Sequence, residues 1–152
     1  MRARVLAIVL LAAAGCGRSF AVRTPGRFVA LDEPGEAFAY RAITADGVVI
    51  AVRSIEHEPR GSLRFWAEAI ENRMRLGEGY AIEPPTGVRA ANGVRGRRLR
   101  FGRDQGTHAY RYWIDLYVTD DWIHLVETGG RADRFDPHRA AIERALSSFR
   151  PE

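Results

Sequence analysis

The sequence predicts an α+β domain in which an antiparallel sheet of about six strands is flanked by two amphipathic helices. Runs of β-forming residues follow one another across short turns, as they do in antiparallel hairpins. Two stretches, residues 62–76 and 135–149, instead repeat their apolar residues at the 3.6-residue spacing of a helix packed on a sheet. The predicted order is three strands, a helix, three strands and a second helix.

The first fifteen residues have the layout of a secretory signal peptide. Arg2 and Arg4 precede an uncharged apolar run at residues 5–14, which is too short to cross a bilayer as a helix of roughly 20 apolar residues. We therefore expect residues 1–15 to be removed on export. The alternative is a buried core helix, but this run lacks the polar face of such a helix.

The residues around the only cysteine resemble the lipobox of bacterial lipoproteins. Cys16 follows the small residues Ala13, Ala14 and Gly15, although the family prefers Leu at the position of Ala13. In that family the cysteine is lipidated on sulfur and becomes the new N-terminus. The resemblance implies a lipid anchor in the bacterial cell envelope. By the same resemblance, Gly17 and Arg18 after the cysteine, with no Asp at position 17, imply the outer membrane, facing the periplasm. The alternative is an ordinary cleaved signal with an incidental cysteine.

The first half of the domain is expected to hold three strands and one helix. Residues 16–26 are expected to be a lipidated tether, and the domain to occupy residues 27–152. Its first strands are expected at residues 27–31, 37–44 and 48–56. Asp46-Gly47 between the last two is a hairpin signal. Ser62 is the expected N-cap of the helix that follows.

The second half is expected to hold three more strands and the second helix. The strands are expected at residues 97–103, 107–119 and 121–129. Pro84-Pro85 excludes a central strand before them. Asp136 is the expected N-cap of the last helix, with Pro137 at its first position.

The charge of the chain does not indicate nucleic-acid binding. The net charge is +4, and all 23 basic residues are arginine. In the most basic stretch, residues 95–103, Leu99 and Phe101 alternate with Arg98 and Arg100. That is the period of a half-buried strand with its arginines facing solvent, so we expect no nucleic-acid partner.

The sequence contains no catalytic or metal-binding signature. The sequence has four histidines, and no two of them are spaced like a pair of metal ligands: His57, His108, His124 and His138. We therefore expect no metal, no cofactor and no enzymatic activity. Asp115 and Glu127, on either side of the expected Asp120-Asp121 turn, leave a hydrolase as the alternative, since paired carboxylates can act as acid and base.

The aromatic run at residues 110–118 is the strongest functional signal. Strand alternation places Ile114 and Leu116 on one face, and Arg111, Trp113 and Tyr117 on the other. Arginine mixed with aromatic residues is typical of protein interfaces. We predict Arg111, Trp113 and Tyr117 as the candidate surface for an envelope protein partner. The alternative is that the helix at 62–76 covers this face.

Gly93 and Gly96 lead into a strand, and the chain ends on a helix with the pattern I-E-x-x-L-x-S-F at residues 142–149. In these features residues 80–150 resemble the PsbP-like superfamily, which includes DcrB-like bacterial envelope lipoproteins. The resemblance implies an antiparallel sheet flanked by helices, no catalysis, and a role in binding or stabilising other proteins. The sequence thus predicts a monomeric, lipid-anchored, non-enzymatic binding or accessory module, with a small-molecule binder as a further alternative.

Overall fold

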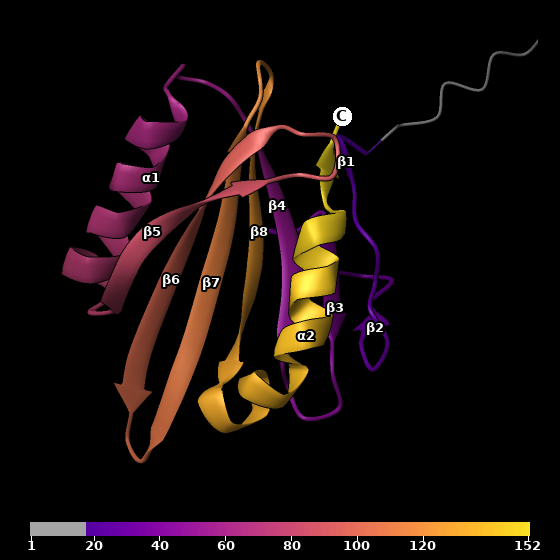
Figure 1. Cartoon of the computed structure of the whole chain (residues 1–152), viewed down its shortest axis with the longest axis vertical. Helices are drawn as coiled ribbons and strands as arrows, with labels where there is room; N and C mark the ends of the chain where they lie inside the picture. Colours follow the sequence, from indigo (N-terminus) through magenta and orange to yellow (C-terminus); the bar gives the residue numbers. More distant parts are fainter. Residues whose placement is uncertain (1–17) are drawn as a thin grey trace, which may run out of the picture.

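A seven-stranded antiparallel sheet forms the centre of the protein, in a computed structural model that describes residues 18–152 (Figure 1). The strand order is β2-β3-β4-β8-β7-β6-β5. The strands are β2 (Val29–Ala30), β3 (Tyr40–Ile43), β4 (Val49–Glu56), β5 (Ala81–Arg89), β6 (Arg95–Gln105), β7 (His108–Val118) and β8 (Trp122–Arg131). This architecture confirms the predicted α+β class, with one more strand in the main sheet than expected.

Two helices and a two-stranded ribbon complete the fold. The helices are α1 (Leu63–Asn72), which continues as the π-helical turn η1 (Arg73–Gly77), and α2 (Ala132–Ser148). The ribbon pairs β1 (Phe20–Ala21) with β9 (Arg150–Pro151), so the start of the described chain lies beside its C-terminal end. No helix within residues 18–152 is long and apolar enough to cross a membrane.

The predicted hairpins are present. Thr44 and Val48 close the β3–β4 turn, in which Gly47 adopts a φ of 88° that favours glycine. Strands β6, β7 and β8 form a meander of two further hairpins. Pairing of β4 with β8, from Val49 opposite Gly129 to Glu56 opposite Trp122, then joins the two halves of the chain into one sheet.

Strand β5 lies at the edge of the sheet, where its prolines can be accommodated. Its pairing with β6 is interrupted between Glu83 and Thr86, at the position of Pro84 and Pro85. Proline cannot donate a hydrogen bond to a neighbouring strand, so it is tolerated at an edge or a bulge. The expectation that this segment is not a central strand therefore agrees with the structure.

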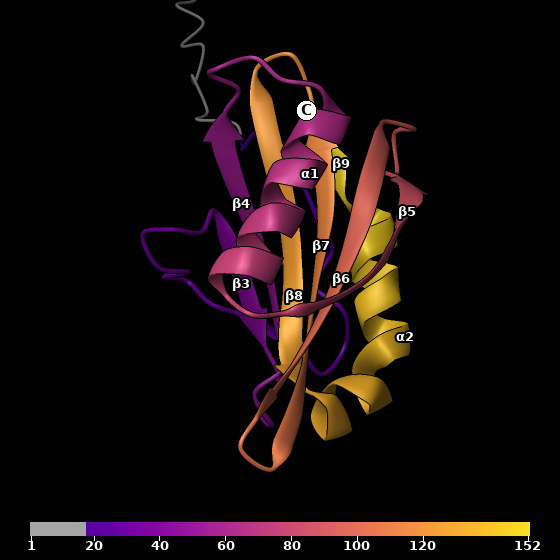
Figure 2. The ribbon, with the colours of Figure 1, turned by 90° about the vertical axis from the view of Figure 1, so that its left-hand side faces the viewer.

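Each face of the sheet is covered by one helix (Figures 1 and 2). On one face, Ala67 of α1 belongs to the same core cluster as Leu99 and Ile114 of the sheet. On the other, α2 packs its apolar side against a larger core. That core includes Phe20, Ile50, Val52, Trp113, Tyr117, Val126, Phe135, Ile142, Leu146 and Phe149. The two faces of β7 are those that alternation predicts.

One predicted helix start is confirmed and the other is wrong. Ser62 caps α1 as predicted, because its hydroxyl accepts the backbone N–H of Phe65 at 3.1 Å. Helix α2 begins earlier than predicted, at Ala132, and Pro137 lies inside it. The additional turn places Phe135 in the core, where its ring lies 4.8 Å from that of Trp113.

The segment expected to be only a tether, residues 16–26, contains β1 and so is partly built into the domain. Phe20 is 4% exposed and stacks on Phe149. Cys16, the predicted lipidation site, lies outside the described residues. Residues 17–19 are therefore all that separates Cys16 from the first strand.

Candidate functional site

A cleft lies between the first helix and the sheet. Helix α1 packs on β6 and β7 and leaves the adjoining part of the same sheet face open over β4 and β8. The resulting space, about 600 Å³, is within the range of small-ligand pockets. Because β4 pairs with β8 along the whole length of β4, this floor is continuous.

The walls of the cleft are mainly apolar. Trp66, Ile70 and Met74 project from α1 and η1 at helical spacing and form one wall. The floor and remaining wall are formed by Ile55, Tyr80, Tyr112, Ile114, Ile123 and Leu125. Ile55 is 46% exposed although it is a large aliphatic residue, so part of this surface is without cover.

A polar group lies on the floor of the cleft. The Tyr112 hydroxyl donates a hydrogen bond to Glu127 Oε2 at 2.6 Å, and Arg53 Nε donates to Glu127 Oε1 at 3.0 Å. Burial raises the pKa of Tyr112, and the Glu127 carboxylate raises it further, so the phenol remains a donor. Tyr112 and Arg53 each donate to one oxygen of Glu127, so these hydrogen bonds and the charge of Arg53 offset the cost of burying the carboxylate.

Arg53 is the member of this group that a ligand can reach. Its side chain is 38% exposed, whereas that of Glu127 is 9% exposed. The guanidinium also lies 4.8 Å from the centre of the Phe38 ring, which restricts its orientation. Other charged residues also line the cleft: Arg73, Glu56, Glu58 and Glu78. The cleft therefore has apolar walls with charged groups among them, and Arg53 is the cation whose orientation a ring and a carboxylate both fix.

The acids suggested for a hydrolase do not share a site. Asp115 faces α2, whereas Glu127 faces the cleft on the opposite side of the sheet. Asp115 is 1% exposed and accepts two hydrogen bonds from Arg98, at 2.6 and 2.8 Å. The two carboxylates therefore cannot act on the same substrate atoms. The suggestion that Asp115 and Glu127 form one acid–base pair is wrong.

Arg98 was expected to face solvent and is instead 7% exposed. Besides Asp115 it binds both oxygens of Glu143 on α2, at 2.9 and 2.7 Å. Burial alone would lower the pKa of Arg98, but the two carboxylates raise it, so the guanidinium stays charged. This network joins β6, β7 and α2, and the alternation of the strand could not reveal it because a helix covers this face.

The aromatic residues of the predicted partner surface are buried. Trp113 is 4% exposed and Tyr117 is 1% exposed, and both pack under α2. Arg111 forms an ion pair with Asp136 of the same helix at 2.8 Å. The expectation of an open surface is therefore wrong for Trp113 and Tyr117, whereas the side chain of Arg111 is 36% exposed. The alternative cover was also misassigned, because the helix over this face is α2 and not the one at 62–76.

One histidine positions the helix that borders the cleft. His57 Nε2 accepts a hydrogen bond from the Gly61 N–H at 2.9 Å, and its Nδ1 lies 2.7 Å from the Thr119 carbonyl. The Trp66 indole N–H also points at Nε2, at 3.4 Å. His57 thus links the loop before α1 to the end of β7. Within residues 18–152 no three metal-ligating side chains converge.

The comparisons with known proteins identify the fold. No family model matches the sequence, and a search of curated proteins returns no match. Three solved structures are similar across most of their length at 9–12% sequence identity. LpqN of Mycobacterium tuberculosis, described as involved in cell envelope biogenesis, has a TM-score of 0.65 and covers 86% of this chain and 81% of its own.

The other two structures agree with this result. Cyanobacterial PsbP from Synechocystis sp. PCC 6803 is 12% identical, with a TM-score of 0.57, and covers 94% of this chain and 99% of its own. PA94 of Pseudomonas aeruginosa is described as a protein of unknown function and putative regulator. It is 10% identical, has a TM-score of 0.56, and covers 91% of this chain and 88% of its own. The protein therefore has a PsbP-like fold.

Proposed function

We propose that this protein is a lipid-anchored accessory module of the bacterial cell envelope that binds an apolar segment of a protein partner in the cleft between α1 and the sheet. The cleft carries the proposal, because it combines apolar walls with the exposed cation of Arg53. An apolar group of the partner would replace water against Trp66 and Met74, and a carbonyl or carboxylate would accept from Arg53.

Two further observations support an envelope role. The lipobox-like sequence ending at Cys16 provides an export route and an anchor. One protein of similar fold, LpqN, is described as involved in cell envelope biogenesis. The separation of Asp115 and Glu127 on opposite sheet faces favours binding over hydrolysis.

The anchor is tested by Cys16→Ser in the native host. We expect the wild type to incorporate labelled fatty acid and fractionate with membranes, and Cys16→Ser to lose the label because the sulfur nucleophile is absent. Equal labelling of both proteins would contradict the lipobox interpretation.

The cleft is tested by photo-crosslinking in cells. A photoreactive amino acid at Ala69, which lines the cleft, should give a protein adduct, and one at Ala140, exposed on α2, should not give the same adduct. Met74→Arg should abolish the Ala69 adduct by placing a charge in the cleft. Adducts that persist in Met74→Arg would refute the site, and a small mass increase without a protein adduct would indicate a small-molecule ligand.

A further inference from the structure

The N-terminal ribbon lies at a corner of the domain where three segments meet. Asn92 in the β5–β6 turn donates to the Pro151 carbonyl at 2.8 Å, and the Ala91 N–H donates to the Phe149 carbonyl at 2.8 Å. The Arg23 N–H donates to Ser148 Oγ at 2.9 Å, at the end of α2. These contacts hold residues 18–25, the β5–β6 turn and the end of α2 together.

This corner is rich in arginine, and we call Arg18, Arg23, Arg89, Arg144 and Arg150 the basic corner. Apart from Arg95, which follows the turn, segments 18–25, 89–95 and 143–152 hold no other cation, and their only acids are Glu143 and Glu152. Both oxygens of Glu143 bind Arg98, and Glu152 pairs with Arg150 at 2.9 Å. The basic corner therefore has a net positive charge.

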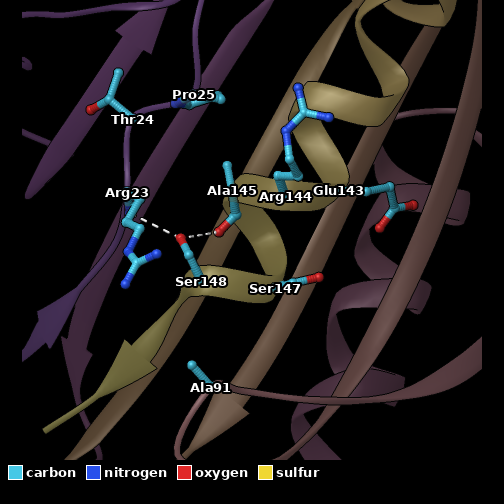
Figure 3. A pocket seen from close by; sticks show the side chains of 9 residues that line it. All are labelled: Arg23, Thr24, Pro25, Ala91, Glu143, Arg144, Ala145, Ser147 and Ser148. Atoms are coloured by element: carbon cyan, nitrogen blue, oxygen red, sulfur yellow. Dashed lines mark hydrogen bonds between the residues drawn. The ribbon is translucent and has the colours of Figure 1, made fainter.

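The basic corner contains a shallow hollow of about 650 Å³ (Figure 3). Arg23 and Arg144 line it from two different segments, together with Ser147. The hollow also includes Ala91 of the β5–β6 turn, so the turn forms part of the same surface. Within the described chain neither Arg23 nor Arg144 has a carboxylate within ion-pair distance, so both charges remain available to an external anion.

The distance from the predicted anchor to this corner is short. The inference rests on the proposed lipid anchor at Cys16, from which four residue steps lead to Phe20 in β1. A fully extended chain spans at most about 3.6 Å per residue, so these steps reach roughly 14 Å. This reach is an upper limit, so the tether allows the corner to lie within one Debye length of the bilayer, about 8 Å at physiological salt, beyond which exposed charges are largely screened.

We propose that the basic corner docks on the anionic phospholipid headgroups of the membrane that holds the lipid anchor. The arginines neutralise headgroup phosphates, to which guanidinium groups bind readily. The other edge of the same end carries more acids than cations (Figure 1). The one cation among the described residues there, Arg60, pairs with Glu58 at 3.6 Å, and the exposed acids of the β7–β8 turn and of β4 and the loop after it are Glu56, Glu58, Asp120 and Asp121. Repulsion of these acids by the same headgroups would tilt the domain onto its basic corner.

This orientation leaves the cleft accessible. The basic corner lies largely on the α2 side of the sheet, whereas the cleft lies on the α1 side. A domain resting on the basic corner would therefore turn its cleft away from the lipid surface and toward soluble segments of a partner. Docking would in this way set the direction from which a partner approaches.

The test uses the lipidated protein in vesicles and a fluorophore on a single introduced cysteine. Cys16 is the only native cysteine, so once it is lipidated Ser147→Cys in the hollow is labelled alone. A quencher on the lipid headgroups should quench this fluorophore in vesicles of phosphatidylcholine with phosphatidylglycerol, and much less in phosphatidylcholine alone. A fluorophore on Asp104→Cys, at the end of β6 beside the β6–β7 turn, should be quenched little in both, because this turn lies at the opposite end of the sheet from β1 and β9 (Figure 1).

The charge dependence is tested with a matched pair of variants. Arg23→Gln with Arg144→Gln should lose the additional quenching on anionic vesicles, as should high salt. Arg75→Gln with Arg134→Gln removes the same charge from exposed sites elsewhere and should retain it. Equal quenching in both lipids, or equal loss in both variants, would overturn the docking. Failure of the wild type to float with either vesicle would instead show that the anchor itself is absent.

Discussion

His124 is predicted to make the stability of the protein fall in mildly acidic solution. It is 0% exposed on β8, where its ring lies 6.1 Å from that of Phe20 and 5.6 Å from that of Phe149. Its Nδ1 lies 2.9 Å from Ser54 Oγ, and its Nε2 has no hydrogen-bond partner among residues 18–152. Burial among these rings lowers the pKa of His124 from 6.5 to about 4, because a charged imidazole would lose its hydration.

The folded-state and unfolded-state pKa values of His124 decide whether acid raises or lowers the free energy of unfolding. Between pH 6.5 and about 4 the unfolded chain binds a proton at this position and the folded chain does not. Lowering the pH in this window therefore favours unfolding, and the loss is complete once the pH falls below the folded-state pKa. The difference between the two pKa values corresponds to a loss of about 3 kcal/mol from this residue.

The measurement is urea unfolding followed by far-UV circular dichroism at several pH values from 7.5 to roughly 4. We expect His124→Phe, which cannot titrate, to show a shallower decline in the free energy of unfolding across this window, whatever its stability at neutral pH. His108→Gln, at an exposed histidine, is the control and should retain the wild-type slope. If His124→Phe and the wild type decline in parallel, His124 does not cause the loss of stability.

Two further predictions concern the interior on the α2 side. Replacing both Trp113 and Tyr117 by Ala should unfold the domain, as seen in thermal melts. Each truncation costs about 3–5 kcal/mol, and the free energy of unfolding of a domain is typically about 5–15 kcal/mol. Survival of the fold would show that α2 does not cover this face. Arg98→Met should lower the urea midpoint by an amount equivalent to about 3–5 kcal/mol, since it leaves Asp115 buried without its partner. Adding Asp115→Leu should recover part of that loss, and additive losses would contradict the pairing.

Local chemistry was sufficient to predict most of the elements. The Asp46-Gly47 turn, the Ser62 cap and the alternation in β7 each depend on a few neighbouring residues, and each has the predicted form. The start of α2 could not be predicted in this way. Pro137 favours a helix start, but burial of Phe135 against Trp113 outweighs that preference and extends the helix backward.

The assignment of helices to sheet faces required long-range information. Alternation separates Trp113 from Ile114, but it does not say which helix each residue meets. The same limit explains why the cleft was missed. Arg53 and Glu127 are 74 residues apart and meet only because β4 pairs with β8 in one particular register. In the sequence alone, each of the two looks like a charged residue that faces solvent on its own strand.

The short ribbon of β1 and β9 is also where mechanical load would enter the domain. Any pull on the N-terminal side is transmitted first to the two-residue pairing of Phe20 and Ala21 with Pro151 and Arg150. Force applied along that direction would peel β1 from β9 and draw Phe20 from its contact with Phe149, while the main sheet remained folded. With the lipid anchor proposed at Cys16, the ribbon would act as a length of chain that is released under tension and lets the domain move farther from the membrane.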